Sequence, residues 1–318
     1  MQPMMSSCGP VLVTGAGGFV GQALVAHLTA AGVAVTGVSR SRAGAASGSL
    51  VQLARYEDAV PLLAGHASVV HLAARVHVMR DTAQDPLALF RAANTDLPVF
   101  LARQAAAAGV RRFVFISSIK VNGEATLPGQ PFTENDVCAP LDAYGVSKWE
   151  AEQGLREIAR QTCMEVVIIR PPLIYGPGVR ANFAALLRAV ARGIPLPLGA
   201  IDNKRSLLAL DNLLDFIALC LFHPGAANQT FLVSDSEDLS TPELIRRMAL
   251  VMKKPARLIS LPLPLLKAAA LVLGRRNMLE RLCGNLQLDI SKARSRLGWN
   301  PPLTVNEGLR RTLEDNKP

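Results

Sequence analysis

A tyrosine and a lysine four residues apart are the side chains of this sequence best suited to proton transfer. Tyr144 and Lys148 belong to a Tyr-Gly-Val-Ser-Lys segment near the start of a predicted helix, and this spacing puts both side chains on one helix face. An ammonium group beside a phenol favours the phenolate and lowers the pKa of the phenol. The pair therefore predicts a general acid and base whose pKa lies closer to the working pH.

Two serines offer a hydroxyl group to the same reaction. Ser117 and Ser118 come at the end of an aromatic and β-branched run, residues 113–117, that predicts a strand. Doubly wound folds bind their ligands at the carboxyl edge of the sheet. A serine there can hold the reacting oxygen between its own hydroxyl group and Tyr144.

A glycine-rich turn predicts a dinucleotide site. Gly15, Gly18 and Gly21 follow the predicted strand 11–14 with the spacing G-x-x-G-x-x-G, and Phe19 and Val20 open the next helix. The first glycine permits a tight turn, the second lets a pyrophosphate approach the backbone, and the third lets helix and strand pack closely. The helix N-terminus then offers N–H groups and a positive dipole to the phosphates.

The end of the next predicted strand bears on the choice of cofactor. An acidic residue there would bind the adenosine ribose of NAD, but this sequence has Arg40 between Ser39 and Ser41. An arginine suits the 2′-phosphate of NADP through charge-assisted hydrogen bonds. NADP(H) is therefore favoured, and NAD(H) remains possible.

Strands and helices alternate in a way that would bring these residues to one sheet edge. Predicted strands at 11–14, 34–38, 69–72, 113–117 and 166–170 alternate with helical patterns at 21–31, 98–108 and 143–161. This rhythm is typical of the α/β class, here a Rossmann-like doubly wound parallel sheet.

After Tyr175 the rhythm breaks into loops rich in glycine and proline. We expect residues 1–175 to form a dinucleotide-binding domain, completed within 207–236 by a helix at 211–222 and a strand at 230–233. Residues 176–206 and 237–318 are expected to form a smaller C-terminal substrate-binding lobe.

Composition narrows the possible functions. With 318 residues, half of them apolar, the chain can bury a large core, and its net charge of +9 suits an anionic ligand. Aromatic residues make up only 5% and do not interleave with basic ones, so nucleic-acid binding is not expected. Neither the five cysteines nor the five histidines show metal-ligand spacing, so we expect no metal and a reducing, cytoplasmic location.

The most apolar stretch of the chain lies near its C-terminal end. Residues 258–273 include Pro262, Pro264 and Lys267 and fall short of the length that a membrane helix requires. We expect a buried helix of the lobe and no stable membrane insertion, with peripheral membrane contact as a lesser alternative.

Six motifs in order resemble the extended short-chain dehydrogenase/reductase family, specifically its nucleotide-sugar epimerases and reductases, over essentially the full length. These are residues 14–21, the His-Leu-Ala-Ala at 71–74, the Asn-Thr-Asp at 94–96, and the segments 117–123, 144–148 and 170–177.

The resemblance implies a role for each matching residue. Tyr144 would be the general acid and base, Lys148 would tune it and hold the nicotinamide ribose, and Ser118 would bind the substrate oxygen. Further cofactor contacts would come from Leu72, Ala73, Ala74, Asn94 and Pro171, and substrate contacts from Asn182, Leu198, Arg205 and, more weakly, Arg281.

Two departures from the family pattern carry information. Sugar dehydratases of the family have an Asp-Glu pair directly after the serine or threonine, where this chain has Ile119 and Lys120. Isoleucine cannot donate or accept a proton, so dehydratase activity is not expected. Asn122 stands where the family usually has tyrosine, which leaves the local substrate contacts open.

The resemblance implies an oxidoreductase that acts at C4 of a UDP-hexose or UDP-N-acetylhexosamine. Because Arg40 suits an exchanging NADPH, an NADPH-dependent 4-keto-sugar reductase is favoured, with a UDP-sugar 4-epimerase as the alternative. A non-catalytic NADP(H)-sensing regulator is a third hypothesis, which the presence of Ser118, Tyr144 and Lys148 disfavours. A homodimer paired through the helices at 98–108 and 143–161 is also expected.

Overall fold

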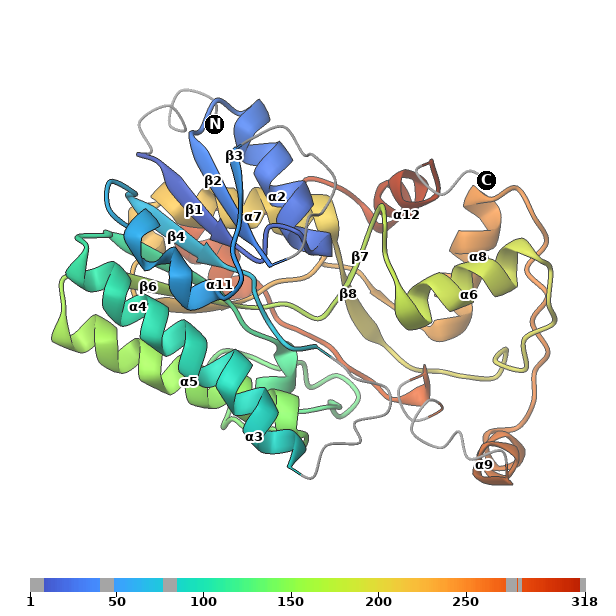
Figure 1. Ribbon diagram of the computed structural model, residues 1–318. Coiled ribbons are helices and arrows are strands. Elements are labelled where there is room, and N and C mark those ends of the chain that lie inside the picture. Colours follow the sequence, from blue (N-terminus) through green and yellow to red (C-terminus); the bar gives the residue numbers. More distant parts are fainter. Residues whose placement is uncertain (1–8, 41–48, 77–84, 273–278, 280–281, 315–318) are drawn as a thin grey trace.

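A seven-stranded parallel sheet forms the larger part of the molecule (Figure 1). The computed structural model describes residues 9–40, 49–76, 85–272, 279 and 282–314. The strand order is β3-β2-β1-β4-β5-β6-β9, and every pairing in this sheet is parallel. The strands are β1 (Val11–Thr14), β2 (Val35–Ser39), β3 (Ser49–Gln52), β4 (Ser68–His71), β5 (Arg112–Ile116), β6 (Glu165–Arg170) and β9 (Gln229–Leu232). The predicted doubly wound α/β fold is confirmed.

Helices cover both faces of this sheet. One face packs against α2 (Phe19–Ala30), α7 (Leu210–Phe222) and α11 (Ser291–Leu297), and the other against α4 (Leu97–Ala107) and α5 (Ala143–Gln161). Figure 1 shows α4 and α5 side by side on their face. Because helices cover both faces, the strands of this sheet consist mainly of apolar residues. Val11–Thr14 and Arg112–Ile116 are buried at every position.

The six strands expected from the sequence agree with the structure to within one residue at each end. Strand β3 was not expected, because it is a four-residue Ser-Leu-Val-Gln segment directly after a run of serine, alanine, glycine and arginine. Its pairing with β2 supplies the order that its own sequence lacks.

The smaller lobe is built around a three-stranded sheet of order β10-β8-β7. Its strands are β7 (Leu173–Tyr175), β8 (Arg205–Ala209) and β10 (Asp238–Leu239), and its core includes α6 (Ala181–Ala191), α8 (Thr241–Val251) and α12 (Val305–Glu314). Figure 1 shows these helices to the right of the main sheet. Residues 290–299, expected in the lobe, instead pack in the core of the main sheet beside α7.

The apolar stretch near the C-terminal end differs from the expected buried helix. Its helix α9 (Leu263–Val272) buries Leu266 but exposes Leu263, Leu265 and Leu271. In the described part of the chain, no helix is long and apolar enough to cross a membrane.

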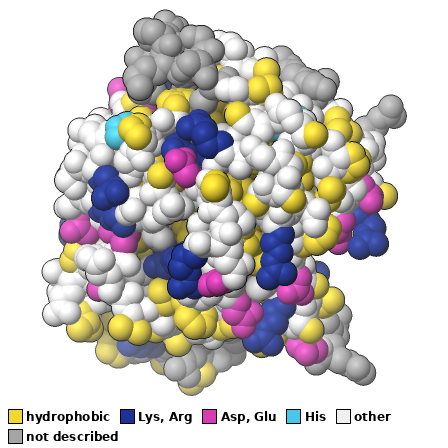
Figure 2. All heavy atoms as spheres, turned by 90° about the vertical axis from the view of Figure 1, so that its left-hand side faces the viewer, with side chains coloured by type: hydrophobic (Ala, Val, Ile, Leu, Met, Phe, Trp, Pro, Cys, Tyr) yellow, Lys and Arg dark blue, Asp and Glu magenta, His cyan; other side chains and the backbone are white. Residues whose placement is uncertain are grey.

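One face of the molecule carries both basic and acidic side chains. Figure 2 shows the left-hand side of Figure 1, and its Lys and Arg side chains lie among Asp and Glu side chains. Interspersed charge of this kind is typical of a solvated protein face.

Candidate active site

The glycine-rich turn has the close approaches that its spacing predicts. Gly15 has a φ of +74°, and a Cβ atom there would lie 2.6 Å from the backbone nitrogen of Ala73. A Cβ atom on Gly21 would lie 2.1 Å from the Gly15 carbonyl oxygen, so the helix and the turn are in direct backbone contact. Only glycine fits either position without a backbone shift.

The start of α2 has the features of an anion site. Gly18 is the N-cap residue and makes no side-chain cap, and a Cβ atom there would meet only the Gly15 carbonyl oxygen, at 3.2 Å. Phe19 and Val20 form the first turn. A helix N-terminus of this kind presents backbone N–H groups and a positive dipole to a phosphate. The turn therefore fits the pyrophosphate of a dinucleotide.

Substituting Gly21 and Gly18 with alanine is expected to separate fold stability from ligand affinity. Gly21→Ala should lower the free energy of unfolding by about 3 kcal/mol, because backbone atoms cannot move aside as a side chain can. Gly18→Ala should cost less than about 1 kcal/mol and weaken dinucleotide binding at least about tenfold. Urea denaturation and ligand fluorescence titration measure the two effects, and equal losses of stability in both variants would contradict the assignment.

A buried asparagine connects the turn to the helix of Tyr144. Asn94 lies in a π-helical segment, Ala92–Asp96, and is fully buried. Its Oδ1 accepts a hydrogen bond from the Arg75 backbone nitrogen at 2.8 Å, and its Nδ2 donates to the Arg75 carbonyl oxygen at 3.1 Å and to Ser147 Oγ at 3.1 Å. Because Ala73 contacts Gly15, this bridge fixes the Leu72–Ala73–Ala74 segment between β1 and α5.

Tyr144, Ser118 and Lys148 meet where β5 and α5 come together. Asp142 caps α5 by accepting a hydrogen bond from the Gly145 nitrogen at 2.7 Å, which places Tyr144 in the first turn. The Tyr144 phenol hydrogen-bonds with the side chain of Ser118. Lys148 Nζ donates to the Ile116 carbonyl oxygen at 2.9 Å. The predicted catalytic residues thus lie in one place.

Burial dominates the proton affinities of this site. It raises the pKa of Tyr144 to about 12, although the Ser118 hydrogen bond opposes the rise. It also lowers the pKa of Lys148 to about 7, with the Glu152 charge acting the other way. The sequence predicted that the Lys148 ammonium group lowers the pKa of Tyr144. In the structure this group donates to the Ile116 carbonyl oxygen and faces the Phe115 ring, and the raised pKa of the phenol follows from burial.

Replacing Lys148 by methionine is expected to stabilise the protein at low pH while removing activity. Because the folded pKa is about 7 against an ordinary 10.5, the unfolded chain binds the extra proton between these values and wild-type stability rises with pH. Lys148→Met should be more stable by about 1–4 kcal/mol at pH 6. Urea unfolding at pH 6 and pH 10 should show this difference shrinking; a constant difference would show that Lys148 is not buried as a charge.

A buried ion network lies next to the site, at Glu152 of α5. Glu152 lies one turn after Lys148, and its carboxylate accepts hydrogen bonds from Ser117 Oγ at 2.6 Å and from Arg170 Nε and Nη2 at 2.9 and 2.5 Å. Glu152 is fully buried and Arg170 is 1% exposed. Arg170 directly precedes Pro171, whose carbonyl oxygen accepts a hydrogen bond from the Ile119 nitrogen at 3.0 Å.

The two departures from the family pattern have structural partners. Asn122 is buried, accepts a hydrogen bond from Arg170 Nη1 at 2.8 Å and donates to the Thr133 carbonyl oxygen at 2.9 Å. Lys120 Nζ pairs with Glu124 at 3.0 Å and with Asp142, the cap of α5. Both residues thus hold the surroundings of Ser118 and Tyr144 in place.

Arg40 lies at the exposed end of β2 against an aromatic ring. Its guanidinium carbon is 5.2 Å from the centroid of the Tyr56 ring, in the 3₁₀-helical segment Tyr56–Leu62. Burial raises the pKa of Tyr56, and the Arg40 charge and hydrogen bond oppose this rise. Stacking on a ring orients the guanidinium plane and leaves its edge available to an anion.

The predicted substrate residues lie on separate elements of the lobe. Arg205, on β8, donates from Nη1 to the Gly284 carbonyl oxygen at 2.9 Å, and burial lowers its pKa. Asn182 is exposed in the first turn of α6, and Leu198 is buried in the lobe core. Arg281 lies outside the described residues. Among the described residues, no hydrogen bond or ion pair joins one of these residues to another.

Sequence reasoning missed three supporting residues. Ser147 joins α5 to Asn94, Glu152 joins α5 to Arg170, and Lys120 pairs with the helix cap. On α5, Ser147 stands three residues after Tyr144 and Glu152 four residues after Lys148, spacings that could have marked them as neighbours of these two residues on the helix. Lys120 gave no signal, since its partner Asp142 is 22 residues away.

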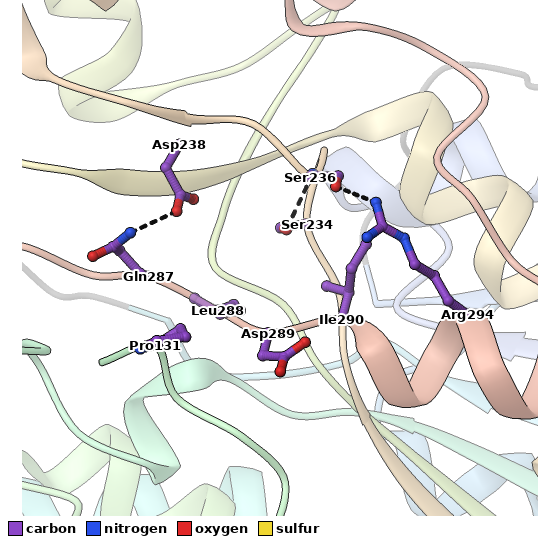
Figure 3. A pocket seen from close by; sticks show the side chains of 9 residues that line it. All are labelled: Pro131, Ser234, Ser236, Asp238, Gln287, Leu288, Asp289, Ile290 and Arg294. Atoms are coloured by element: carbon purple, nitrogen blue, oxygen red, sulfur yellow. Dashed lines mark hydrogen bonds between the residues drawn. The ribbon is translucent and has the colours of Figure 1, made fainter. Parts of the chain in front are cut away.

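A separate pocket of about 220 Å³ lies between the lobe and the main sheet (Figure 3). Its polar groups are already paired, since Gln287 Nε2 donates to Asp238 at 2.8 Å and Arg294 hydrogen-bonds with Ser236. None of the predicted site residues lines it. We therefore place the candidate active site at Tyr144 and not in this pocket.

Comparisons with known proteins agree with this placement. The model of the NAD dependent epimerase/dehydratase family matches residues 11–234. The chain is 47% identical over 309 residues to a UDP-glucose 4-epimerase of Vibrio cholerae, covering 96% of this chain and 94% of that protein. It is 30% identical to a UDP-glucose 4-epimerase of Mycolicibacterium smegmatis, covering 95% and 97%. The solved structure of MoeE5 in complex with UDP-glucose and NAD is 25% identical, covers 97% of this chain and 98% of that one, and has a TM-score of 0.78.

Proposed function

This chain belongs to the NAD-dependent epimerase/dehydratase family, and from that premise we propose that it is a UDP-sugar 4-epimerase. The observation that carries the proposal is the 47% identity to a UDP-glucose 4-epimerase across almost the whole of both chains. The sequence alone favoured a 4-keto-sugar reductase because of Arg40. The relatives support the epimerase better, so the reductase becomes the second candidate, favoured by that one residue.

A nicotinamide dinucleotide fits the residues of the site. Gly15, Gly18 and Gly21 would hold its pyrophosphate at the start of α2, and the segment at 72–74 would lie along it, fixed by Asn94. When bound in its oxidised form, the nicotinamide supplies the hydride acceptor and a positive charge that lowers the pKa of the Tyr144 phenol. Lys148 would hold the ribose beside it.

The chain's own groups would handle the proton and the sugar oxygen. Tyr144 takes the proton from the C4 hydroxyl group as the ketone forms and returns it when the ketone is reduced. Ser118, already hydrogen-bonded to the phenol, holds the same oxygen in line. Lys148 is 2% exposed, so bulk water has little access to its ammonium group. Epimerisation further requires that the keto sugar turns over in the pocket before reduction.

The sugar diphosphate would be held by the lobe. Arg205 is the strongest candidate because its fork can pair with two phosphate oxygens, and burial makes its charge costly without a partner. Leu198 would pack against the nucleotide base, and Asn182 and Arg281 would add contacts at the diphosphate. These assignments follow the family pattern.

The proposed activity can be tested with purified protein and NMR. UDP-glucose and UDP-N-acetylglucosamine are each incubated with a catalytic amount of NAD+, and the C4 epimer should accumulate to a fixed equilibrium ratio without net reduction of the dinucleotide. A UDP-4-keto-6-deoxy sugar is incubated in parallel with NADPH. Stoichiometric NADPH oxidation in the second assay, with no epimer in the first, would establish the reductase instead.

Arg40 is expected to decide the preference between the two dinucleotides. If it binds the 2′-phosphate, Arg40→Ser should weaken NADP+ binding about 10- to 100-fold and change NAD+ binding by less than about twofold. Arg55→Ser, which removes an exposed arginine paired with Glu57, is the matched control. Calorimetric titration of both dinucleotides gives the comparison. An equal loss for both would mean that Arg40 acts only by covering Tyr56.

A further inference from the structure

Lys120 connects two segments of the candidate active site. It lies in the 3₁₀ turn Ile119–Val121, which follows β5. Its backbone nitrogen donates to Ser118 Oγ at 3.3 Å, and its Nζ pairs with Asp142, the N-cap residue of α5. A Cβ atom on Gly145 would lie 2.9 Å from the Lys120 carbonyl oxygen, so the turn and the helix start are in backbone contact. Lys120 thus joins the serine turn to the first turn of α5.

The Asp142 carboxylate stabilises α5 but disfavours ionisation of the Tyr144 phenol. It caps the helix by accepting a hydrogen bond from the Gly145 nitrogen at 2.7 Å. Burial raises the pKa of Tyr144 to about 12, and the negative charge of Asp142 adds to this rise. A raised pKa disfavours the phenolate, which is the form that can take a proton from a substrate hydroxyl group. The site therefore needs the cap, while its charge opposes the reaction.

The Lys120 ammonium group supplies the opposite charge next to this carboxylate. The Lys120 side chain is 19% exposed and that of Asp142 31%, so salt screens this pair less than a fully exposed pair. Glu124 pairs with the same ammonium group at 3.0 Å. Charged groups reach this part of the site from three segments: Lys120 and Glu124 after β5, Asp142 and Lys148 at α5, and Arg75, which lies over the Phe90 ring that pairs edge-to-face with Tyr144.

We propose that Lys120 is a positioning residue of the proposed epimerase, whose ammonium group keeps the Asp142 carboxylate from opposing ionisation of the Tyr144 phenol. This inference rests on the proposed function, since it assigns Lys120 to the proton transfer by Tyr144. Lys120 acts through Asp142 and needs no contact with the sugar or the dinucleotide. An ion pair that only stabilised the fold would leave the pH dependence of the reaction unchanged.

The test is the pH dependence of kcat for C4 epimerisation at saturating UDP-sugar and NAD+, where the rate rises with pH as the phenol ionises. Lys120→Met should move the midpoint of this rise upward by about 0.5–1 pH unit, because the Asp142 charge is left uncompensated near the phenol. The rate lost at neutral pH should return at higher pH. Asp142→Asn should move the midpoint downward, since asparagine caps a helix about as well as aspartate but carries no charge.

Three further variants make the comparison specific. Lys120→Arg keeps the charge and should restore most of the wild-type midpoint. In an Asp142→Asn background, Lys120→Met should move the midpoint by at most about half as much, because the carboxylate through which it acts is gone. Arg311→Met removes the partner of Asp211, which is 34% exposed in the first turn of α7, and should leave the midpoint unchanged. Lys148 is present in every variant, so its own titration does not produce these differences. Urea denaturation checks that all variants are folded.

A measurement without substrate separates this inference from the proposed activity. Ultraviolet titration of the NAD+ complex follows tyrosinate formation, and subtraction of the titration of Tyr144→Phe isolates the Tyr144 phenol. The same shifts should appear there even if no UDP-sugar were turned over, in which case only the epimerase proposal fails. An unchanged midpoint in Lys120→Met, a rate loss that is equal at all pH values, or an equal shift in Arg311→Met would overturn the role of Lys120. So would a Tyr144 phenol that stays protonated up to about pH 10 in this complex, the ordinary pKa of a phenol.

Discussion

Replacing Tyr144 with phenylalanine is expected to lower the kcat for C4 epimerisation by about 10²- to 10⁴-fold, because the ring stays in place while the proton carrier is removed. The phenol hydrogen-bonds with Ser118 and lies at the start of the helix that also carries Lys148. Loss of one hydroxyl group should leave dinucleotide binding nearly unchanged. Initial rates at saturating UDP-sugar measure the effect.

Tyr56→Phe is the matched control for this prediction. It removes a phenol hydroxyl group from a tyrosine that lies against Arg40 and not at Ser118. At saturating dinucleotide and UDP-sugar, its kcat should stay within about threefold of the wild type. If Tyr144→Phe retained wild-type turnover, Tyr144 would not be the proton carrier. If neither the wild type nor the variant turned over a UDP-sugar while both bound the dinucleotide, the sensing regulator would replace the enzyme.

Breaking the Arg170–Glu152 pair is expected to cost about 3–5 kcal/mol of unfolding free energy. Arg170→Met leaves a fully buried carboxylate that has lost two of its hydrogen bonds and keeps those from Ser117 and from Arg156, the latter at 2.8 Å. The variant should also lose activity, because the same carboxylate accepts a hydrogen bond from Ser117 next to Ser118. Urea denaturation gives the free energy.

A second variant separates charge from packing in this network. Arg311→Met removes one partner of an exposed ion pair with Asp211 and should cost less than about 1 kcal/mol. The double variant Arg170→Met/Glu152→Leu should be more stable than Arg170→Met alone, because it removes the uncompensated charge. A loss of less than about 1 kcal/mol in Arg170→Met would show that solvent reaches Glu152.

Local signals in the sequence were sufficient for most of the fold. Strands buried on both faces require continuous apolar runs, and these marked six of the seven strands of the main sheet. The glycine positions were equally readable, since Gly15 needs a positive φ and Gly21 a backbone contact that no other residue allows. Strand β3 could not be predicted, because its order comes from pairing with β2.

Contacts between distant residues limited the prediction of the site. The Tyr-x-x-x-Lys pair lies within one helix, but Asn94 reaches Ser147 over 53 positions and Arg170 reaches Asn122 over 48. The sequence near each of these residues does not indicate a hydrogen-bond partner so far along the chain. The pKa of Tyr144 was mispredicted for the same reason. The sequence indicates that Lys148 is nearby, but it does not indicate the burial that raises the pKa to about 12.

Two predictions about the lobe were wrong because they depended on tertiary packing. The apolar composition of 258–273 predicted burial, yet Leu266 of α9 is buried while Leu263, Leu265 and Leu271 are exposed. Residues 290–299 have a polar, arginine-rich helix, and only the fold shows Ala293, Leu297 and Trp299 packed beside α7.

The most direct test of the proposed epimerase follows a deuterium label placed at C4 of UDP-glucose and of UDP-N-acetylglucosamine. The label should reappear at C4 of the epimeric product with only a catalytic amount of NAD+ present and with no exchange with solvent, since one hydride leaves C4 and the same one returns to its other face. Mass spectrometry and NMR of the isolated product show its position. Loss of the label would contradict the proposal. The absence of a C4 epimer from both substrates would contradict it as well.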